Sequence, residues 1–97
     1  MKNLNELQED ISEWSGLVFG EDFSIDNVLE HLVEESEDLQ TSPYDILHYA
    51  DVMILLLGAL EKAAYSSEDL LQAIEAKMII NKTRNWEKDE NGRYRHK

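Results

Sequence analysis

A run of acidic side chains lies in the first half of this chain, and it reads Glu34, Glu35, Ser36, Glu37, Asp38. On a helical projection, Glu35 falls on the same face as the apolar residues Val28 and Leu32. Glu34 and Asp38 fall at the border of that face. A carboxylate removed from water loses several kcal/mol of solvation unless it has a partner. A bound cation is one such partner, and a fully solvated acidic face is the alternative.

A second unusual feature is Asp51, an acidic residue within the most apolar stretch of the chain, residues 46–60. His48 and Asp51 are three apart there and therefore share one face of a helix. A hydrogen-bonded structural Asp is one explanation. The other is the second half of a metal site that faces Glu35 and Asp38 from the neighbouring helix, as in helical bundles that bind metals between inward carboxylates.

A row of donors follows near the end of the last predicted helix. Lys77, Asn81 and Arg84 recur at intervals of four and three, so an ammonium, an amide and a guanidinium share one side. Such donors suit phosphate oxygens, because they make charge-assisted hydrogen bonds. The alternative is a solvated basic face, which is common near helix C-termini.

Four helices are predicted to position these groups, and they account for most of the chain. Their expected ranges are 3–14, about 25–40 with Ser24 as N-cap, 44–64 with Pro43 suited to its first turn, and about 66–86. Ser15-Gly16 and Gly20 are expected to punctuate the link after the first helix. We expect an all-α, four-helix bundle-like fold with one domain over residues 1–86. For the polar tail 87–97, composition favours disorder, and a cover over the site is the alternative.

Composition narrows the classes of partner. The formal net charge of −12 argues against nucleic-acid binding, which needs a basic surface. The apolar run 52–57 is too short to span a bilayer, so no membrane partner is expected. No signal peptide is recognised, and the absence of cysteine suits a reducing cytoplasm.

The third predicted helix is apolar on all sides, which predicts burial on all sides. A chain of 97 residues has too few elements to bury it unaided. We therefore expect a homo-oligomer, a dimer or a tetramer, with a large apolar interface.

These residues together resemble the all-α nucleotide pyrophosphohydrolases of the MazG-like group, whose signature is Glu-Glu-x-x-Glu followed by Glu-x-x-Asp. The two halves here read Glu34-Glu35-Ser36-Glu37-Asp38 and His48-Tyr49-Ala50-Asp51. The short, often phage-borne dATP/dGTP branch, which includes MazZ-like enzymes, is the nearer match. The shared features there are Trp14-Ser15, Phe19-Gly20, His31-Leu32, and the ending Lys77-x-x-x-Asn81-x-x-Arg84-x-Trp86. Three residues depart from the pattern, namely Asp38 and His48 in place of Glu, and Gly58 where the branch often has an acid.

The resemblance implies hydrolysis of a deoxynucleoside triphosphate, dGTP or dATP, to the monophosphate and pyrophosphate. It implies that Glu35, Asp38 and Asp51 hold one or two Mg²⁺ or Mn²⁺ ions, with Glu34 as a further ligand or as the base for the attacking water. His31 and His48 are then expected to contact the metal-binding carboxylates without binding the ion themselves. Alternatively, His31 is a histidine at the edge of the core, and His48 ligates Mn²⁺ directly. Lys77, Asn81 and Arg84 are expected to bind the phosphates, and Trp14 or Phe19 to contact the base.

Two other functions stay open at this point. One is a sister pyrophosphohydrolase that acts on dCTP or dUTP. A non-catalytic acidic helical module also fits the size and charge, but it gives no reason for Asp51 within an apolar helix.

Overall fold

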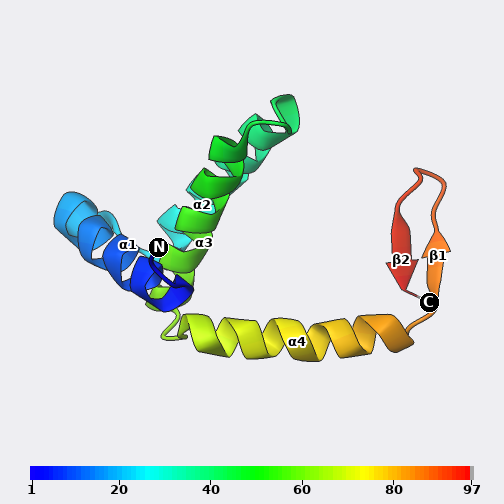
Figure 1. The fold of residues 1–97 in the computed structure, drawn as a ribbon. Helices are drawn as coiled ribbons and strands as arrows, with labels where there is room; N and C mark the ends of the chain where they lie inside the picture. Colours follow the sequence, from blue (N-terminus) through cyan, green and yellow to red (C-terminus); the bar gives the residue numbers. More distant parts are fainter. Residues whose placement is uncertain (97) are drawn as a thin grey trace. The chain divides into compact units, whose positions relative to one another are not determined.

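A computed structural model describes residues 1–96, without the side chain of His96. Its elements are α1 (Leu4–Phe19), the short 3-10 helix η1 (Gly20–Asp22), α2 (Ile25–Thr41), α3 (Ile46–Lys62), α4 (Ser67–Thr83), and the strands β1 (Trp86–Lys88) and β2 (Tyr94–His96) (Figure 1). The prediction of an all-α fold is confirmed for the body of the chain. The hairpin was not predicted, because strands of three residues are too short to show a period.

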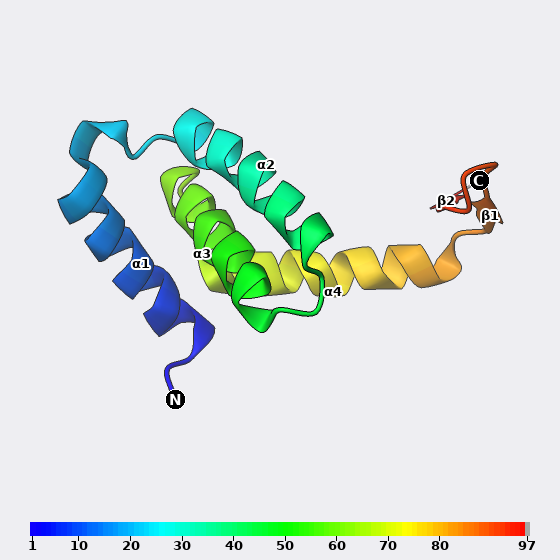
Figure 2. The same cartoon turned by 90° about the horizontal axis from the view of Figure 1, so that it is seen from above.

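The chain divides into two compact units, one comprising Met1–Ser67 and the other beginning at Glu68. In the first unit, α2 and α3 lie side by side and run in opposite directions, and α1 packs against α3 (Figure 2). Phe23, Val28 and Ala59 form the buried centre, and Leu57 is also buried. This small core holds together the two helices that carry the acidic motifs.

The start of α2 follows the predicted capping chemistry, whereas the end of α1 does not. Ser24 caps α2 as predicted, because its hydroxyl accepts a hydrogen bond from the Asn27 backbone at 3.2 Å. The prediction that α1 ends near Ser15-Gly16 is wrong. The helix continues to Phe19 and ends where Gly20 takes a positive φ of 53°.

The start of α3 also differs from the prediction. Asp45 is its N-cap and accepts a hydrogen bond from the Leu47 backbone at 3.0 Å. Pro43 lies in the turn before the helix rather than in its first turn. An Asp side chain that can satisfy a free backbone N–H fixes the start of the helix two residues later than expected.

Gln8 connects α1 to the residues that follow α3. It is 2% exposed, its amide oxygen accepts a hydrogen bond from the Ser67 backbone at 2.8 Å, and its amide nitrogen donates to the Tyr65 carbonyl at 3.1 Å. Both polar ends of the buried side chain are therefore satisfied. The loop after α3 is tied to α1 by one residue that the sequence pattern did not single out.

One side of α3 is not covered within a single chain. Ile46 and Leu47 are 75% and 67% exposed, and Met53 and Ile54 are also exposed. The expectation of burial on every side is therefore not met by one protomer, although Leu57, Gly58 and Ala59 are buried. Exposed contiguous apolar side chains are typical of an association surface.

The second unit contains α4 and the antiparallel hairpin, in which Glu87 pairs with Arg95. Asp89 organises the turn, because its carboxylate accepts hydrogen bonds from the backbones of Asn91 at 3.0 Å and Arg93 at 2.8 Å. The Arg95 side chain donates to the same carboxylate at 3.2 Å. Residues 87–96 are folded, so the disorder that composition favours there is not observed.

No helical segment in the described residues combines the length and the apolar character that crossing a bilayer requires.

Candidate metal and nucleotide site

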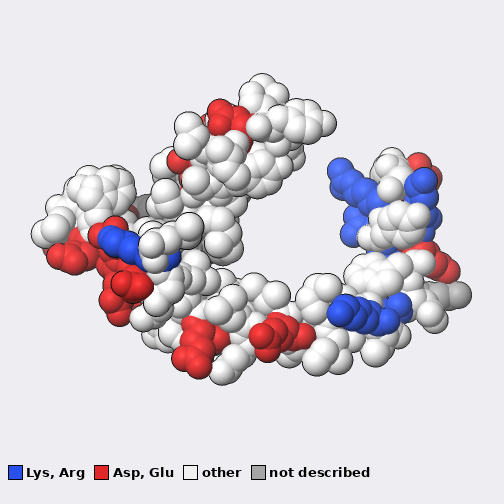
Figure 3. Space-filling view, in the orientation of Figure 1, with Lys and Arg blue, Asp and Glu red and all other residues white. Residues whose placement is uncertain are grey.

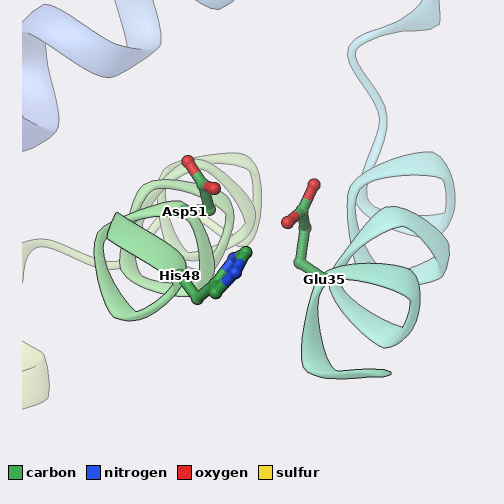
Figure 4. Close-up of side chains that lie close together, drawn as sticks. All are labelled: Glu35, His48 and Asp51. Carbon is green, nitrogen blue, oxygen red and sulfur yellow. The ribbon is translucent and has the colours of Figure 1, made fainter. Parts of the chain in front are cut away.

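Glu35, His48 and Asp51 come together between α2 and α3. Each offers one ligand atom, and the three atoms all lie within 4.8 Å of one another. Figure 4 shows the Glu35 carboxylate on α2 opposite the two side chains from α3. The antiparallel pairing of the helices brings the two halves of the acidic motif to the same level, and the i, i+3 spacing puts His48 and Asp51 on one face.

Glu35 is the more enclosed of the two carboxylates, with its side chain 20% exposed. His31, one turn earlier on α2, places Nε2 at 3.3 Å from Glu35 Oε1. This is the contact that the i, i+4 spacing predicts. Contacts of this kind, made by residues behind a ligand, orient the ligand in a metal site.

His48 has one ring nitrogen without a partner. Nδ1 is buried and makes no hydrogen bond within residues 1–96, and Nε2 lies 3.8 Å from Asp45 Oδ2. A buried polar atom without a partner is costly. An imidazole nitrogen beside two carboxylates is a donor set that suits Mn²⁺ well and Mg²⁺ less well. The residues present therefore fit a divalent ion.

The remaining predicted acids lie outside this trio. Glu34 and Asp38 are exposed on α2, and neither belongs to the close group that the described residues form. Asp51 itself is exposed in a single chain, so its expected place in a dry interior is not observed. The structure brings Glu35 and Asp51 together as predicted, but it replaces Asp38 with His48 as their neighbour.

A pocket of about 310 Å³ opens beside the trio within the first unit. Its lining is mostly apolar, and comprises Trp14, Ser15, Phe19, Asp22, Phe23, Asn27, Val28, His31, Glu35, Asp51, Ile54, Leu55 and Gly58. Trp14 and Phe19 meet edge to face, with ring centroids 5.5 Å apart. Apolar walls with a few polar groups are typical of small-ligand sites. Trp14, which was predicted to contact the base, lies in this lining.

The predicted phosphate-binding row belongs to the second unit. Lys77 and Asn81 lie on α4, and Arg84 follows the last helical residue, Thr83. The Asn81 carbonyl accepts a hydrogen bond from Trp86 Nε1 at 2.8 Å, which fixes the start of the hairpin. Seven of the nine Lys and Arg residues of the chain lie in 77–97. Figure 3 shows basic side chains of the described residues over the end of α4 and the hairpin. This row stays a prediction as a substrate site.

Comparison with known proteins decides the family. The family model of dATP/dGTP pyrophosphohydrolase matches residues 7–97. The chain belongs to this family. It is therefore an enzyme that hydrolyses an acid anhydride, with purine deoxynucleoside triphosphates as substrates, and the non-catalytic module and the dCTP/dUTP enzyme are set aside.

Individual relatives agree with the family assignment. A dATP/dGTP diphosphohydrolase of cyanophage S-2L is 37% identical over 93 residues, which are 94% of this chain and 85% of the relative. A protein of Salmonella phage PMBT28 with the same name is 35% identical over 94% of this chain and 30% of its own length. A solved MazG-like pyrophosphohydrolase of cyanophage S-2L, bound to dGDP and three catalytic Mn²⁺ ions per active site, superposes with a TM-score of 0.82. It is 32% identical and covers 100% of this chain and 99% of its own. The predicted four-helix MazG-like fold is thereby confirmed.

Sequence reasoning did not assign Asn27, Phe23 or Gly58 to the site, although all three line the pocket. A signal was available for Asn27, because it precedes His31 by four residues and Glu35 by eight and therefore shares their helix face. No such signal existed for Gly58, whose place opposite Phe23 depends on the packing of α3.

Proposed function

We propose that this family member releases pyrophosphate from dGTP or dATP at a centre held by Glu35, His48 and Asp51, with Mn²⁺ or Mg²⁺ as cofactor. The convergence of these three ligand atoms within 4.8 Å, next to a pocket with aromatic walls, is the observation that carries the proposal. The Mn²⁺ ions and dGDP of the cyanophage neighbour support it. The phage origin of the relatives also favours action in the cytoplasm of an infected bacterial host.

Each residue has a defined part in this scheme. Bound divalent ions polarise phosphate oxygens and stabilise the charge that develops on them. Glu35 and Asp51 supply the oxygen ligands, His48 supplies a nitrogen ligand, and His31 holds Glu35 in place from 3.3 Å. The apolar walls around Trp14 and Phe19 receive the base and exclude water from it.

Three ligand residues are too few to hold several ions, and the cyanophage neighbour holds three Mn²⁺ ions per active site. Glu34 and Asp38 flank Glu35 on α2 and are exposed, so they are free to complete the coordination of further ions. Glu34 remains our candidate for the base that accepts a proton from the attacking water. Lys77, Asn81 and Arg84 remain the candidates for binding the β- and γ-phosphates.

We also propose that the working form is a homo-oligomer, a dimer or a tetramer. The uncovered apolar face of α3 supports this, because it exposes Ile46, Leu47 and Met53 in a single chain.

The direct test measures pyrophosphate release from each dNTP with Mn²⁺ or Mg²⁺ for the wild type and for Asp51→Asn. The variant keeps the size of the side chain but removes its charge, so we expect the rate to fall about 100-fold or more, beyond the loss typical of an indirect partner. Helical circular dichroism should stay unchanged. Glu37→Gln is the matched control, since Glu37 is exposed on the same acidic run and outside the trio. An active Asp51→Asn enzyme would remove this residue from the centre.

A further inference from the structure

The pocket has a polar group at the end away from the metal ligands. Asn27 and Glu35 both line it, and they are two turns apart on the same face of α2. Eight residues of α-helix span about 12 Å, a length comparable to that of a nucleoside monophosphate. A nucleotide whose phosphates lie near Glu35 therefore has its base near Asn27.

The Asn27 side chain is held in one orientation. Its Nδ2 donates a hydrogen bond to the Asp22 carbonyl at 3.0 Å. The backbone of the same residue donates to the Ser24 hydroxyl at 3.2 Å, which fixes the first turn of α2. One N–H of Nδ2 is engaged with this carbonyl, and no hydrogen bond given for the described residues ends on Oδ1, so the amide can offer that oxygen as an acceptor beside its second N–H. An Asn locked in this way presents an acceptor to a ligand.

The surroundings indicate what kind of ligand group this acceptor meets. Trp14, Phe19 and Phe23 supply ring surfaces for a flat heterocycle. Asp22 also lines the pocket, and no Lys or Arg of the described residues does, so the polar groups at this end mainly accept hydrogen bonds. Adenine and guanine each have an exocyclic amine on the pairing edge, at C6 in adenine and at C2 in guanine, whereas hypoxanthine has no exocyclic amine.

We propose that Asn27 is a specificity-determining residue that recognises the exocyclic amine of a purine base through Oδ1. This inference rests on the proposed function, because it requires the base to occupy the pocket beside Glu35. It also assigns the bond between Asn27 and Asp22 a purpose, since the bond restrains the amide and keeps Oδ1 in one position.

The test compares kcat/KM for dGTP and dITP, which differ only by the 2-amino group. We expect the wild type to prefer dGTP by about tenfold, the size expected of one hydrogen bond. Asn27→Leu keeps the volume but removes the acceptor, so the preference should vanish through a higher KM for dGTP. Asn27→Asp keeps an oxygen acceptor and should retain the preference. Glu30→Gln, on an exposed position of the same helix that does not line the pocket, is the control.

The outcomes separate the two proposals. If the wild type releases no pyrophosphate from any dNTP, the proposed function fails and this inference fails with it. If the wild type is active but does not distinguish dGTP from dITP, or if Asn27→Leu keeps the full preference, only the role of Asn27 is overturned. A general loss of stability in Asn27→Leu lowers both rates together and leaves their ratio unchanged, so the ratio reports recognition and not folding.

Discussion

At the scale of the residue, His48 is the side chain that distinguishes this centre. One of its ring nitrogens lies within 4.8 Å of a carboxylate oxygen of Glu35 and of one of Asp51. Its buried Nδ1 has no hydrogen-bond partner among the described residues. The family signature has Glu at this position. A nitrogen donor is softer than a carboxylate oxygen, so the substitution favours Mn²⁺ over Mg²⁺.

This reasoning predicts the effect of His48→Glu. The variant restores an oxygen ligand, and we expect the ratio of apparent affinities for Mn²⁺ and Mg²⁺ to fall about tenfold, within the range found for changes around metal ligands. Thermal unfolding in a titration of each ion measures the ratio independently of activity, because an ion that binds only the native state raises the melting temperature. An unchanged ratio contradicts a ligand role for His48.

At the scale of the element, the antiparallel pair α2 and α3 determines which residues face each other. Glu35 meets Asp51 at one level of the pair, and Phe23 meets Gly58 near the start of α2. A Cβ at Gly58 would lie 3.5 Å from the Phe23 ring and 3.9 Å from Ile11, which is ordinary van der Waals contact. The glycine is therefore not required by close packing, but it widens the pocket that it lines.

Gly58→Ala is expected to stabilise the protein and to weaken substrate binding. Alanine in a helix interior is more favourable than glycine by about 1 kcal/mol. For a domain of this size, the melting temperature should rise by roughly 4 °C or more. The added methyl narrows the pocket, so the KM for dGTP should rise. A lower melting temperature would show that the packing around Phe23 does not tolerate the methyl group.

The hairpin gives a second prediction at this scale. The backbone N–H of Arg93, together with the Arg95 side chain and the backbone of Asn91, lowers the pKa of Asp89 despite partial desolvation. A group whose pKa is lowered in the folded state stabilises that state above its unfolded pKa. This stabilisation is lost as the pH falls through the folded pKa. We therefore expect the turn to loosen only in strong acid.

Amide NMR signals of residues 89–95 measure this loosening during an acid titration. Asp89→Asn should loosen the turn at neutral pH, because the charge that strengthens its hydrogen bonds is gone. Glu90→Gln removes a neighbouring charge from the same turn without removing a bond that the described structure contains, and it should have little effect. Equal behaviour of the two variants contradicts the central role of Asp89.

At the scale of the whole molecule, the main feature is the apolar surface that a single chain leaves exposed. The exposed side chains on α3 include Ile46 at 75% and Leu47 at 67%. Residues 71–80 of α4 are exposed as well, although they include Leu71, Ile74 and Met78. A monomer of 11.3 kDa with this much apolar surface is expected to associate with copies of itself.

Sedimentation measurements test this expectation with Leu47→Glu. The position is near the start of α3, where a negative charge favours the helix, so the helix itself should tolerate the change. We expect the particle mass to fall toward that of one chain. Gln40→Glu introduces the same charge at an exposed polar position of α2 and should leave the mass unchanged. A wild type that sediments as a monomer contradicts oligomerisation altogether.

The sequence by itself determined most of the helices, the cap at Ser24, the family, and the helix faces on which Glu35 and Asp51 lie, because periodicity and local capping act over a few residues. Only the tertiary structure decided that His48 replaces Asp38 beside these acids, and that Asn27 and Gly58 line the pocket. The level at which two helices pack depends on side chains distant in sequence, such as Phe23 and Ala59, and helical spacing within one segment contains no information about it. The hairpin likewise depends on the Asp89 carboxylate, whose partners are chosen by the fold of the turn and not by any repeat.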